Sequence, residues 1–376
     1  MSDAPVPEAD RLGDAPHPRD TPALFGQDAA QGAFLAAYAQ ERLHHAWLIT
    51  GPRGVGKATL AWRIARFLLA EAPVEAGMFG APAPPTTLDI DAEHPVARRV
   101  AAGSEGRLFL VRRSWDAKTK RLKSTIGVDE VRGLKSFFAM SATDGGRRVV
   151  IVDAADEMTV NAANALLKVL EEPPDRCTLL LISHQPARLL PTIRSRCREL
   201  RCAVLSPDDI GRAVAQAGGD GADHVGALAE LAQGSAGAAL GLAEEDGPKI
   251  YADLVALAGT MPRVDRPAVL KLAEGAVGRG KEARRDLTLR LIDLMLVRLA
   301  RFGAGQAPVA EAAKGEAEAL ARLSPDMAAA RAWAGLQQEL SGRATHALAV
   351  NLDPASLILD MVLRINETAA DILSRR

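Results

Sequence analysis

A glycine-rich segment that follows a short apolar run limits the folds open to this chain more than any other feature. Residues 51–58 read Gly-Pro-Arg-Gly-Val-Gly-Lys-Ala, the spacing of a P-loop. The apolar run at 46–50 predicts a buried strand, and a helical pattern starts at Lys57. Backbone N–H groups of such a loop bind phosphate oxygens, and its Lys reaches the outer phosphates. The candidate nucleotide-binding residues are therefore Gly51, Gly54, Gly56 and Lys57.

Two positions near this loop lack the groups that make ATP reactive. Ala58 stands where a Ser or Thr hydroxyl would hold Mg²⁺. The apolar run at 149–153 ends in Asp153, which either orients a magnesium-bound water or caps the next turn. Ala154 follows it, so no carboxylate there can polarise an attacking water, and the next acidic side chains are expected on the turn rather than beside the loop: Asp156 and Glu157. We expect no hydrolysis by this chain alone and no well-held Mg²⁺. Weak binding of ATP or ADP and a loop retained only for folding stay open as alternatives.

Alternating strand and helix patterns over the first 205 residues predict an α/β domain with a parallel sheet and right-handed crossovers. The predicted strands are 46–50, 108–111, 149–153, 178–182 and 200–204; the predicted helices lie near 29–38 and 57–68 and at 128–138, 161–171 and 191–197. Residues 1–22 are rich in Pro and charge and predict a disordered tail. Strand signals end at Pro207, which predicts a P-loop domain over 23–205, a small helical unit over 206–247 and an all-α domain over 248–376.

Charge and cysteine content narrow the functional classes. The net charge is -1, so any contact with nucleic acid must come from a local patch. The basic segment 112–123 is such a patch, although a solvated hairpin face explains it equally well. The three cysteines have neither disulfide nor zinc spacing: Cys177, Cys197 and Cys202. No apolar run reaches the roughly 18 residues of a membrane span, and we expect a cytoplasmic protein without zinc or another bound metal.

The tripeptide Ser195-Arg196-Cys197 follows the predicted strand at 178–182. An Arg here could reach the γ-phosphate of ATP bound by a neighbouring subunit, because a planar guanidinium stabilises phosphoryl transfer. The alternative is a surface Arg within a basic run. Its place after the strand and before the helical unit favours the catalytic role for Arg196.

These motifs resemble the clamp-loader branch of the AAA+ proteins, most of all the delta-prime subunits of bacterial DNA polymerase III. The resemblance rests on four segments: Phe25-Gly26-Gln27, the P-loop, the run Ala-Leu-Leu-Lys-Val-Leu-Glu-Glu-Pro-Pro at 165–174, and Ser195-Arg196-Cys197. It implies a RecA-like AAA+ domain, a three-helix lid and a helical collar that joins a five-membered ring. The implied partners are the gamma/tau and delta subunits, the sliding clamp and, through the assembled complex, primed-template DNA.

The resemblance also implies which kind of subunit this is. ATP-hydrolysing relatives carry a hydroxyl after the P-loop Lys, an Asp-Glu pair on the acidic strand and a sensor Arg in the lid. The matching positions here are Ala58, Ala154 and Gly237, while Ser183 or His184 falls near the first sensor. This pattern predicts a non-catalytic stator that donates Arg196 in trans. The four zinc cysteines of many relatives have no counterpart before Cys177.

Whether this chain is itself an enzyme is a separate question. The resemblance implies a part of a DNA-directed DNA polymerase holoenzyme, a nucleotidyltransferase complex, rather than an ATPase in its own right. The rival interpretation is an active gamma/tau-like subunit with an unusual magnesium site. An unrelated P-loop kinase would leave the Ser-Arg-Cys segment unexplained.

Overall fold

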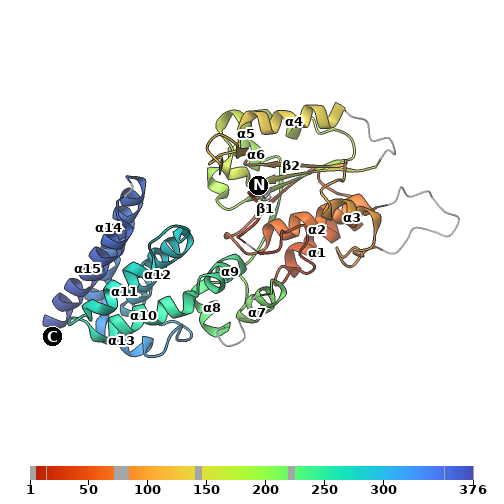
Figure 1. Ribbon diagram of the computed structural model, residues 1–376. Coiled ribbons are helices and arrows are strands. Elements are labelled where there is room, and N and C mark those ends of the chain that lie inside the picture. The colour runs from red at the N-terminus through yellow and green to blue at the C-terminus, as the bar shows by residue number, and fades with distance from the viewer. Residues whose placement is uncertain are drawn as a thin grey trace. The chain divides into compact units, whose positions relative to one another are not determined.

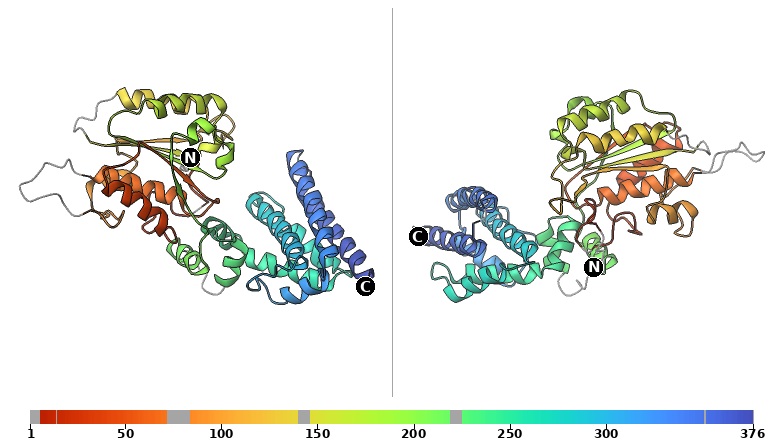
Figure 2. Two further views of the ribbon diagram at one scale, coloured as in Figure 1. Left: turned by 180° about the vertical axis from the view of Figure 1, so that it is seen from behind. Right: turned by 45° about the horizontal axis from the view of Figure 1, so that its top comes forward.

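The computed structural model describes residues 6–13, 15–71, 84–139, 146–218, 225–350 and 352–375. The chain forms two compact units (Figures 1 and 2). The first comprises Met1–Asp209 together with Ser235–Gly237, and the second comprises Ile210–Gly234 and Ala238–Arg376. The predicted division into a tail, a P-loop domain, a lid and a collar places its boundaries elsewhere, at 22, 205 and 247, and stays a prediction.

A parallel five-stranded sheet forms the centre of the first unit, in the order β2-β5-β6-β1-β7. Its strands are β1 (Ala46–Thr50), β2 (Leu108–Arg112), β5 (Arg148–Asp153), β6 (Cys177–Ser183) and β7 (Arg198–Arg201). The chain leaves β1 for the far edge of the sheet and later returns to the other side of β1, so the strand order reverses there. In open α/β sheets, ligands bind beyond the carboxyl ends of the strands at such a point.

Helices cover both faces of this sheet (Figures 1 and 2). One face packs against α1 (Asp28–Ala39), α2 (Lys57–Ala70) and α3 (Pro95–Ala101); the other packs against α4 (Val128–Ala139), α5 (Val160–Glu171) and α6 (Pro191–Arg194). Alternation along β1 produces this arrangement, because Trp47 and Ile49 enter the first core and Ala46 and Leu48 enter the second. Short 3-10 turns follow β5 and β6: η1 (Ala155–Glu157) and η2 (Pro186–Arg188).

From residue 207 onward, the described residues form helices and no strands. These helices are α7 (Pro207–Gln216), α8 (Val225–Ala232), α9 (Ala236–Glu244), α10 (Gly247–Thr260), α11 (Arg266–Gly275), α12 (Glu282–Gly303), α13 (Glu316–Leu323), α14 (Met327–Ala349) and α15 (Pro354–Ser374). Asp side chains cap three of them by accepting a backbone N–H of the first turn: Asp265, Asp326 and Asp353. Among the described residues of 206–246, the helices are α7, α8 and α9.

A buried ionic cluster ties four helices of the second unit together. Arg298 on α12 forms two hydrogen bonds with the Glu316 carboxylate on α13, at 2.6 and 3.0 Å. The Tyr251 hydroxyl on α10 donates to the same carboxylate, and Arg298 also pairs with Glu230 on α8 at 3.3 Å. The Glu316 side chain is only 2% exposed, so its charge is compensated by partners rather than by water.

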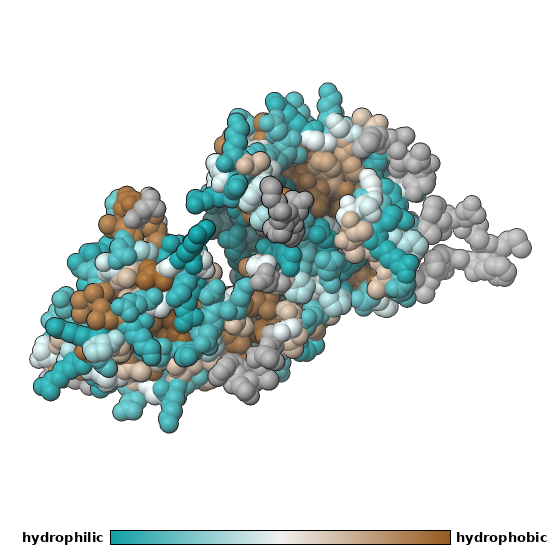
Figure 3. All heavy atoms as spheres, viewed as in Figure 1, coloured by the Kyte–Doolittle hydropathy of each residue, from teal (hydrophilic) through white to brown (hydrophobic). Residues whose placement is uncertain are grey.

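The surface is polar over most of the face seen in Figure 3, with apolar areas on both units. Large apolar side chains exposed in the second unit lie on α11, in the α12–α13 connection and around the two ends of α14: Leu270, Val309, Met327, Val350 and Leu352. Among the described residues, no helix is both long and apolar enough to cross a membrane.

The five predicted strands and the five predicted helices of the α/β region are confirmed within a few residues. The helix predicted at 191–197 is shorter, because α6 ends at Arg194 and leaves Arg196 in the turn before β7 (Arg198–Arg201). The helix α3 (Pro95–Ala101) was not predicted. The basic segment 112–123 contains the small hairpin β3–β4 (Trp115–Asp116 and Arg121–Leu122), as one of its two interpretations expected.

The predicted disordered tail also differs from the structure. Residues 6–13 and 15–22 are placed against the first unit, with His17 only 3% exposed. Residues 1–5 and 14 lie outside the described residues. The compositional rule counts Pro and charge, and it does not register that the charges of this segment find partners of opposite sign in the folded domain.

Candidate functional site

The P-loop lies where the sequence predicts, between the end of β1 and the start of α2. Gly54 and Gly56 have φ angles of 77° and 97°, a backbone region that glycine adopts without steric cost. Gly56 is the N-cap of α2, so the loop leads into the positive end of that helix. This backbone has the form of a phosphate cradle.

The turn that leads into α9, together with the first residues of that helix, covers the middle of the loop. The Gly237 N–H donates to the Gly54 carbonyl at 2.9 Å, and the Ser235 hydroxyl donates to the Arg53 carbonyl at 2.9 Å. A Cβ atom added at Gly237 would lie 2.9 Å from the Gly54 Cα. Position 237, which corresponds to the sensor Arg of the resemblance, therefore has no room for a side chain while this turn rests on the loop.

Gln27 fixes the other side of the loop and explains the Phe-Gly-Gln motif. Its side-chain amide donates to the carbonyls of Val55 and Ala203, at 3.0 and 2.9 Å. Its oxygen accepts the Ala203 N–H at 2.9 Å. This buried amide joins the start of α1 to the P-loop and to the chain that leaves β7, so Gln27 is a positioning residue that the sequence indicated only through the resemblance.

Lys57 is turned toward its own loop. Its Nζ donates to the Gly51 carbonyl at 2.8 Å and also to the Pro52 carbonyl, and the residue is 3% exposed. Burial lowers the pKa of Lys57 to about 8, against the raising effect of Asp153 and Asp156. In this arrangement the ammonium satisfies loop carbonyls rather than facing outward to a phosphate.

Asp153 lies at the carboxyl end of β5, near Lys57. Burial, together with the charges of Asp10 and Glu157, raises the pKa of Asp153 to about 7. Near neutral pH this carboxyl group is therefore partly protonated. Ala58, which follows the P-loop Lys, supplies no hydroxyl.

Glu157 lies closer to the loop than the sequence indicated. Its carboxylate pairs with Arg53 of the P-loop at 3.2 Å and with Arg113 at 2.8 Å. Asp156 instead accepts the backbone N–H groups of His184 and Gln185. The expectation that both acidic residues lie away from the loop was therefore wrong for Glu157. Three-dimensional folding of η1 toward the loop, rather than sequence spacing, brings it there.

The end of β6 contributes two polar atoms without a partner among the described residues. These are Ser183 Oγ and His184 Nδ1, both buried. Burial, with the Lys57 charge as the next cause, lowers the pKa of His184 to about 4. The residues near the first sensor position therefore lie by the P-loop, and His184 is neutral at physiological pH.

Arg196 has different surroundings. Its guanidinium donates to the Thr192 carbonyl at 3.0 Å and pairs with Glu171 at 3.0 Å, and its side chain is 36% exposed. Glu171 ends α5 and is the first acidic residue of the Leu-Glu-Glu-Pro-Pro run. The Ser-Arg-Cys and Leu-Glu-Glu-Pro-Pro motifs, which lie apart in the sequence, are thus joined by an ion pair at the surface. Their spacing in the sequence did not predict this contact.

The three cysteines are free thiols. Burial raises the pKa values of Cys177 and Cys197 to about 12 and that of Cys202 to about 11, so all three stay protonated near neutral pH. Within the described ranges, His, Cys, Asp and Glu side chains form no group of three or more arranged to hold a metal ion.

Comparison with known proteins bears on the same region. Residues 26–206 match the family described as "DNA polymerase III, delta subunit". The delta' subunit of Pseudomonas aeruginosa is 42% identical over 160 residues, 43% of each chain. The delta' subunit of Escherichia coli is 33% identical over 217 residues, 56% of this chain and 58% of that one.

Over residues 26–206, just under half of its length, the chain is similar to the DNA polymerase III clamp-loader family. The sheet order and the P-loop after β1 fit the AAA+ fold of that family, followed by an all-α region. The gamma subunit of Buchnera aphidicola is also similar, with 28% identity over 232 residues, 60% of this chain and 58% of that one. The chain spans about half the length of these curated relatives, and the matches include both kinds of subunit.

Proposed function

We propose that this chain is a non-catalytic, delta-prime-like subunit of the bacterial DNA polymerase III clamp loader. In this role it helps to load the sliding clamp onto primed DNA during replication, in the cytoplasm. It supplies Arg196 to ATP bound by a neighbouring subunit and hydrolyses none itself. Its partners are the gamma/tau and delta subunits in a five-membered ring, the clamp and primed-template DNA.

One observation carries this proposal: the start of α9 lies directly on the P-loop backbone, where Gly237 contacts Gly54. A sensor Arg at this position would need space that the Gly54 Cα occupies, 2.9 Å from an added Cβ. The missing hydroxyl at Ala58 and the raised pKa of Asp153 act in the same direction. Three separate requirements of ATP hydrolysis are thus weakened at one site.

The surroundings of Arg196 support a role outside this site. Exposed guanidinium groups contribute little to folding stability, so stability gives no reason for its place in the turn after α6. A planar guanidinium suits the charge that spreads over a transferred phosphoryl group. In the proposed mechanism, Arg196 leaves Glu171 and turns to the phosphate of the neighbour, so Glu171 holds the finger while that phosphate is absent.

The alternative is an active gamma/tau-like ATPase, and the matches to gamma subunits support it. ATP turnover by the purified chain separates the two. The proposal expects no turnover above background, and Lys57→Ala then changes nothing. Steady turnover that Lys57→Ala abolishes would overturn the stator role and favour an active subunit.

A further inference from the structure

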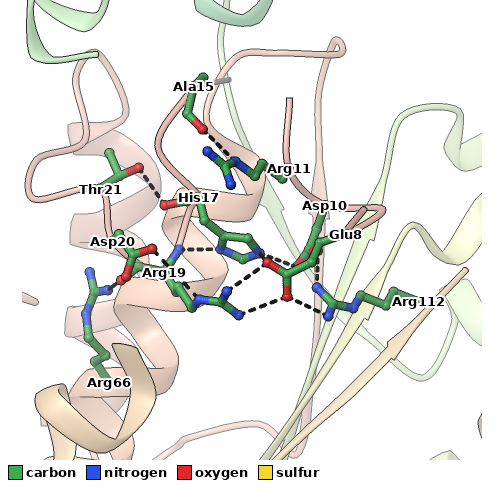
Figure 4. A network of polar contacts seen from close by, with 10 residues as sticks. All are labelled: Glu8, Asp10, Arg11, Ala15, His17, Arg19, Asp20, Thr21, Arg66 and Arg112. Carbon is green, nitrogen blue, oxygen red and sulfur yellow. Dashed lines mark hydrogen bonds and ion pairs between the residues drawn. The ribbon is translucent and has the colours of Figure 1, made fainter. Parts of the chain in front are cut away.

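The N-terminal strap, residues 6–13 and 15–22, is held on the first unit by a cluster of ion pairs (Figure 4). Glu8 pairs with Arg19 at 2.7 Å and with Arg112 at 2.8 Å. Asp10 pairs with Arg112 and lies 3.2 Å from the Nε2 atom of His17. The Asp10 side chain is 3% exposed. Two acidic side chains of the strap are therefore drawn into the domain by Arg112, which ends β2.

Both carboxyl groups are ionised at neutral pH. Burial acts to raise the pKa of Asp10, but His17 and Arg112 outweigh it and hold that pKa below its ordinary value. Arg112 and Arg19 do the same for Glu8 against its burial. The strap therefore carries two ionised carboxylates into this place, where Arg19 and Arg112 are their cationic partners.

His17 attaches the strap to the helix that follows the P-loop. Its Nδ1 accepts the Arg19 N–H at 3.0 Å, and its Nε2 faces Asp10. The ring meets Trp62 of α2 edge-on, with centroids 5.5 Å apart. Further along, Arg66 and Arg63 of α2 donate to the carbonyls of Arg19 and Pro22: both contacts lie on the strap backbone.

The carboxylates of the strap lie beside the acidic end of the nucleotide site. Arg112 is the register partner of Asp153 across β2 and β5, and the Asp10 charge contributes to the raised pKa of Asp153. Leu12 lies 3.5 Å from the place where Gly237 would carry a Cβ atom. The strap thus reaches both Asp153 and the turn that covers the loop.

We infer that the strap occupies the approach to the P-loop and that Glu8 and Asp10 keep nucleotide phosphates out by charge. A nucleotide brings two or more negative charges to the loop, and carboxylates in a partly buried site repel them more strongly than carboxylates in bulk water would. The strap also engages Arg112, a cation next to Asp153 that would otherwise attract phosphate. The inference concerns the chain's own loop and does not depend on the role of Arg196.

The test is a calorimetric titration of the full chain with ADP and with adenosine. The variant Glu8→Gln/Asp10→Asn removes the two charges, and we expect it to bind ADP about tenfold tighter or more than wild type does, with little change for adenosine. The control variant Asp91→Asn/Asp129→Asn removes two exposed carboxylates of the same unit, and it is expected to bind both ligands as wild type does.

Limited trypsin digestion reports on the strap itself. Loss of its ion pairs should speed cleavage after Arg11 and Arg19 in the double variant. Should that variant fold poorly, Asp10→Asn alone keeps the pairs of Glu8 and is expected to show a smaller gain of the same sign. Unchanged ADP affinity in these variants, or an equal gain for adenosine, would overturn the inference.

Discussion

The P-loop and the turn that carries Arg196 lie at opposite ends of two parallel neighbouring strands, because the loop follows β1 and the turn precedes β7, and they are built in opposite ways. The loop is surrounded by its own chain: Gly237 lies on Gly54, Gln27 holds Val55, and Lys57 donates to loop carbonyls. Arg196 is partly exposed, and it pairs with Glu171 and donates to the Thr192 carbonyl. The polar groups of the P-loop are bound by other groups of the same chain, whereas the guanidinium of Arg196 is partly exposed to solvent.

The two regions differ in how easily their polar groups can exchange their present partners for a new ligand. A buried group whose partners come from its own chain is already compensated, and a new ligand must displace those partners. A half-exposed Arg with one exposed partner loses little when it changes partner, because surface ion pairs contribute only about 0–1 kcal/mol. Under the proposed function, the loop therefore serves folding and the turn that carries Arg196 acts in trans.

The largest expected effect comes from Arg196→Ala. In the active site that this residue serves, we expect ATP turnover to fall by about 10³–10⁵, as for other arginine fingers. Lys should rescue poorly, because a point charge lacks the planar fork. The measurement is ATP turnover by the reconstituted loader with clamp and primed DNA. The loss in total turnover is smaller if other active sites, each with its own arginine finger, also hydrolyse ATP. Arg194→Ala, in the same basic run, is the matched control and should behave as wild type.

The next effect concerns the contact that covers the loop. Gly237→Ala should destabilise the chain by about 1–3 kcal/mol, because the added methyl group meets the backbone of Gly54 and the turn must move. Gly241→Ala in the same helix meets nothing within 4 Å and should stabilise by up to about 1 kcal/mol. Thermal melting of both variants checks this. Equal melting temperatures would show that the turn does not rest on the loop in solution.

A smaller effect follows from the raised pKa of Asp153. Its pKa of about 7 in the fold compares with 3.8 for the ordinary group, so between these values the folded chain keeps a proton that the unfolded chain has released. Stability from this group is therefore present at low pH and is lost as pH rises toward 7. Asp153→Asn should stabilise by about 1–2 kcal/mol at pH 8 and by almost nothing at pH 4.

Melting curves of wild type and Asp153→Asn across that range check the sign. The neutral His184 acts in the opposite direction, since its pKa of about 4 costs stability as pH falls below 6.5. Both proteins contain His184, so its contribution cancels in the difference. An equal gain in stability at pH 4 and at pH 8 would mean that the fold does not raise the pKa of Asp153.

Much of this could be predicted from the sequence, because the relevant signals are local. Apolar runs with glycine and proline boundaries located the five strands of the sheet, and the P-loop spacing located the nucleotide site. What could not be predicted depends on partners far apart in the chain. The Glu8–Arg112 pair spans 104 residues and the Ser235–Arg53 contact spans 182. Composition marks such segments as polar, and only the fold shows that their charges and backbone groups meet.

The proposed role, a non-catalytic subunit that supplies Arg196 to a neighbour, is tested most directly by comparing two variants in one reconstituted loader. Lys57→Ala alters the chain's own P-loop, and Arg196→Ala alters the group offered to a neighbour. With clamp and primed DNA present, and with assembly checked by gel filtration, we predict that ATP turnover and clamp loading are unchanged by Lys57→Ala and strongly reduced by Arg196→Ala. Strong loss with Lys57→Ala and normal turnover with Arg196→Ala would contradict the account.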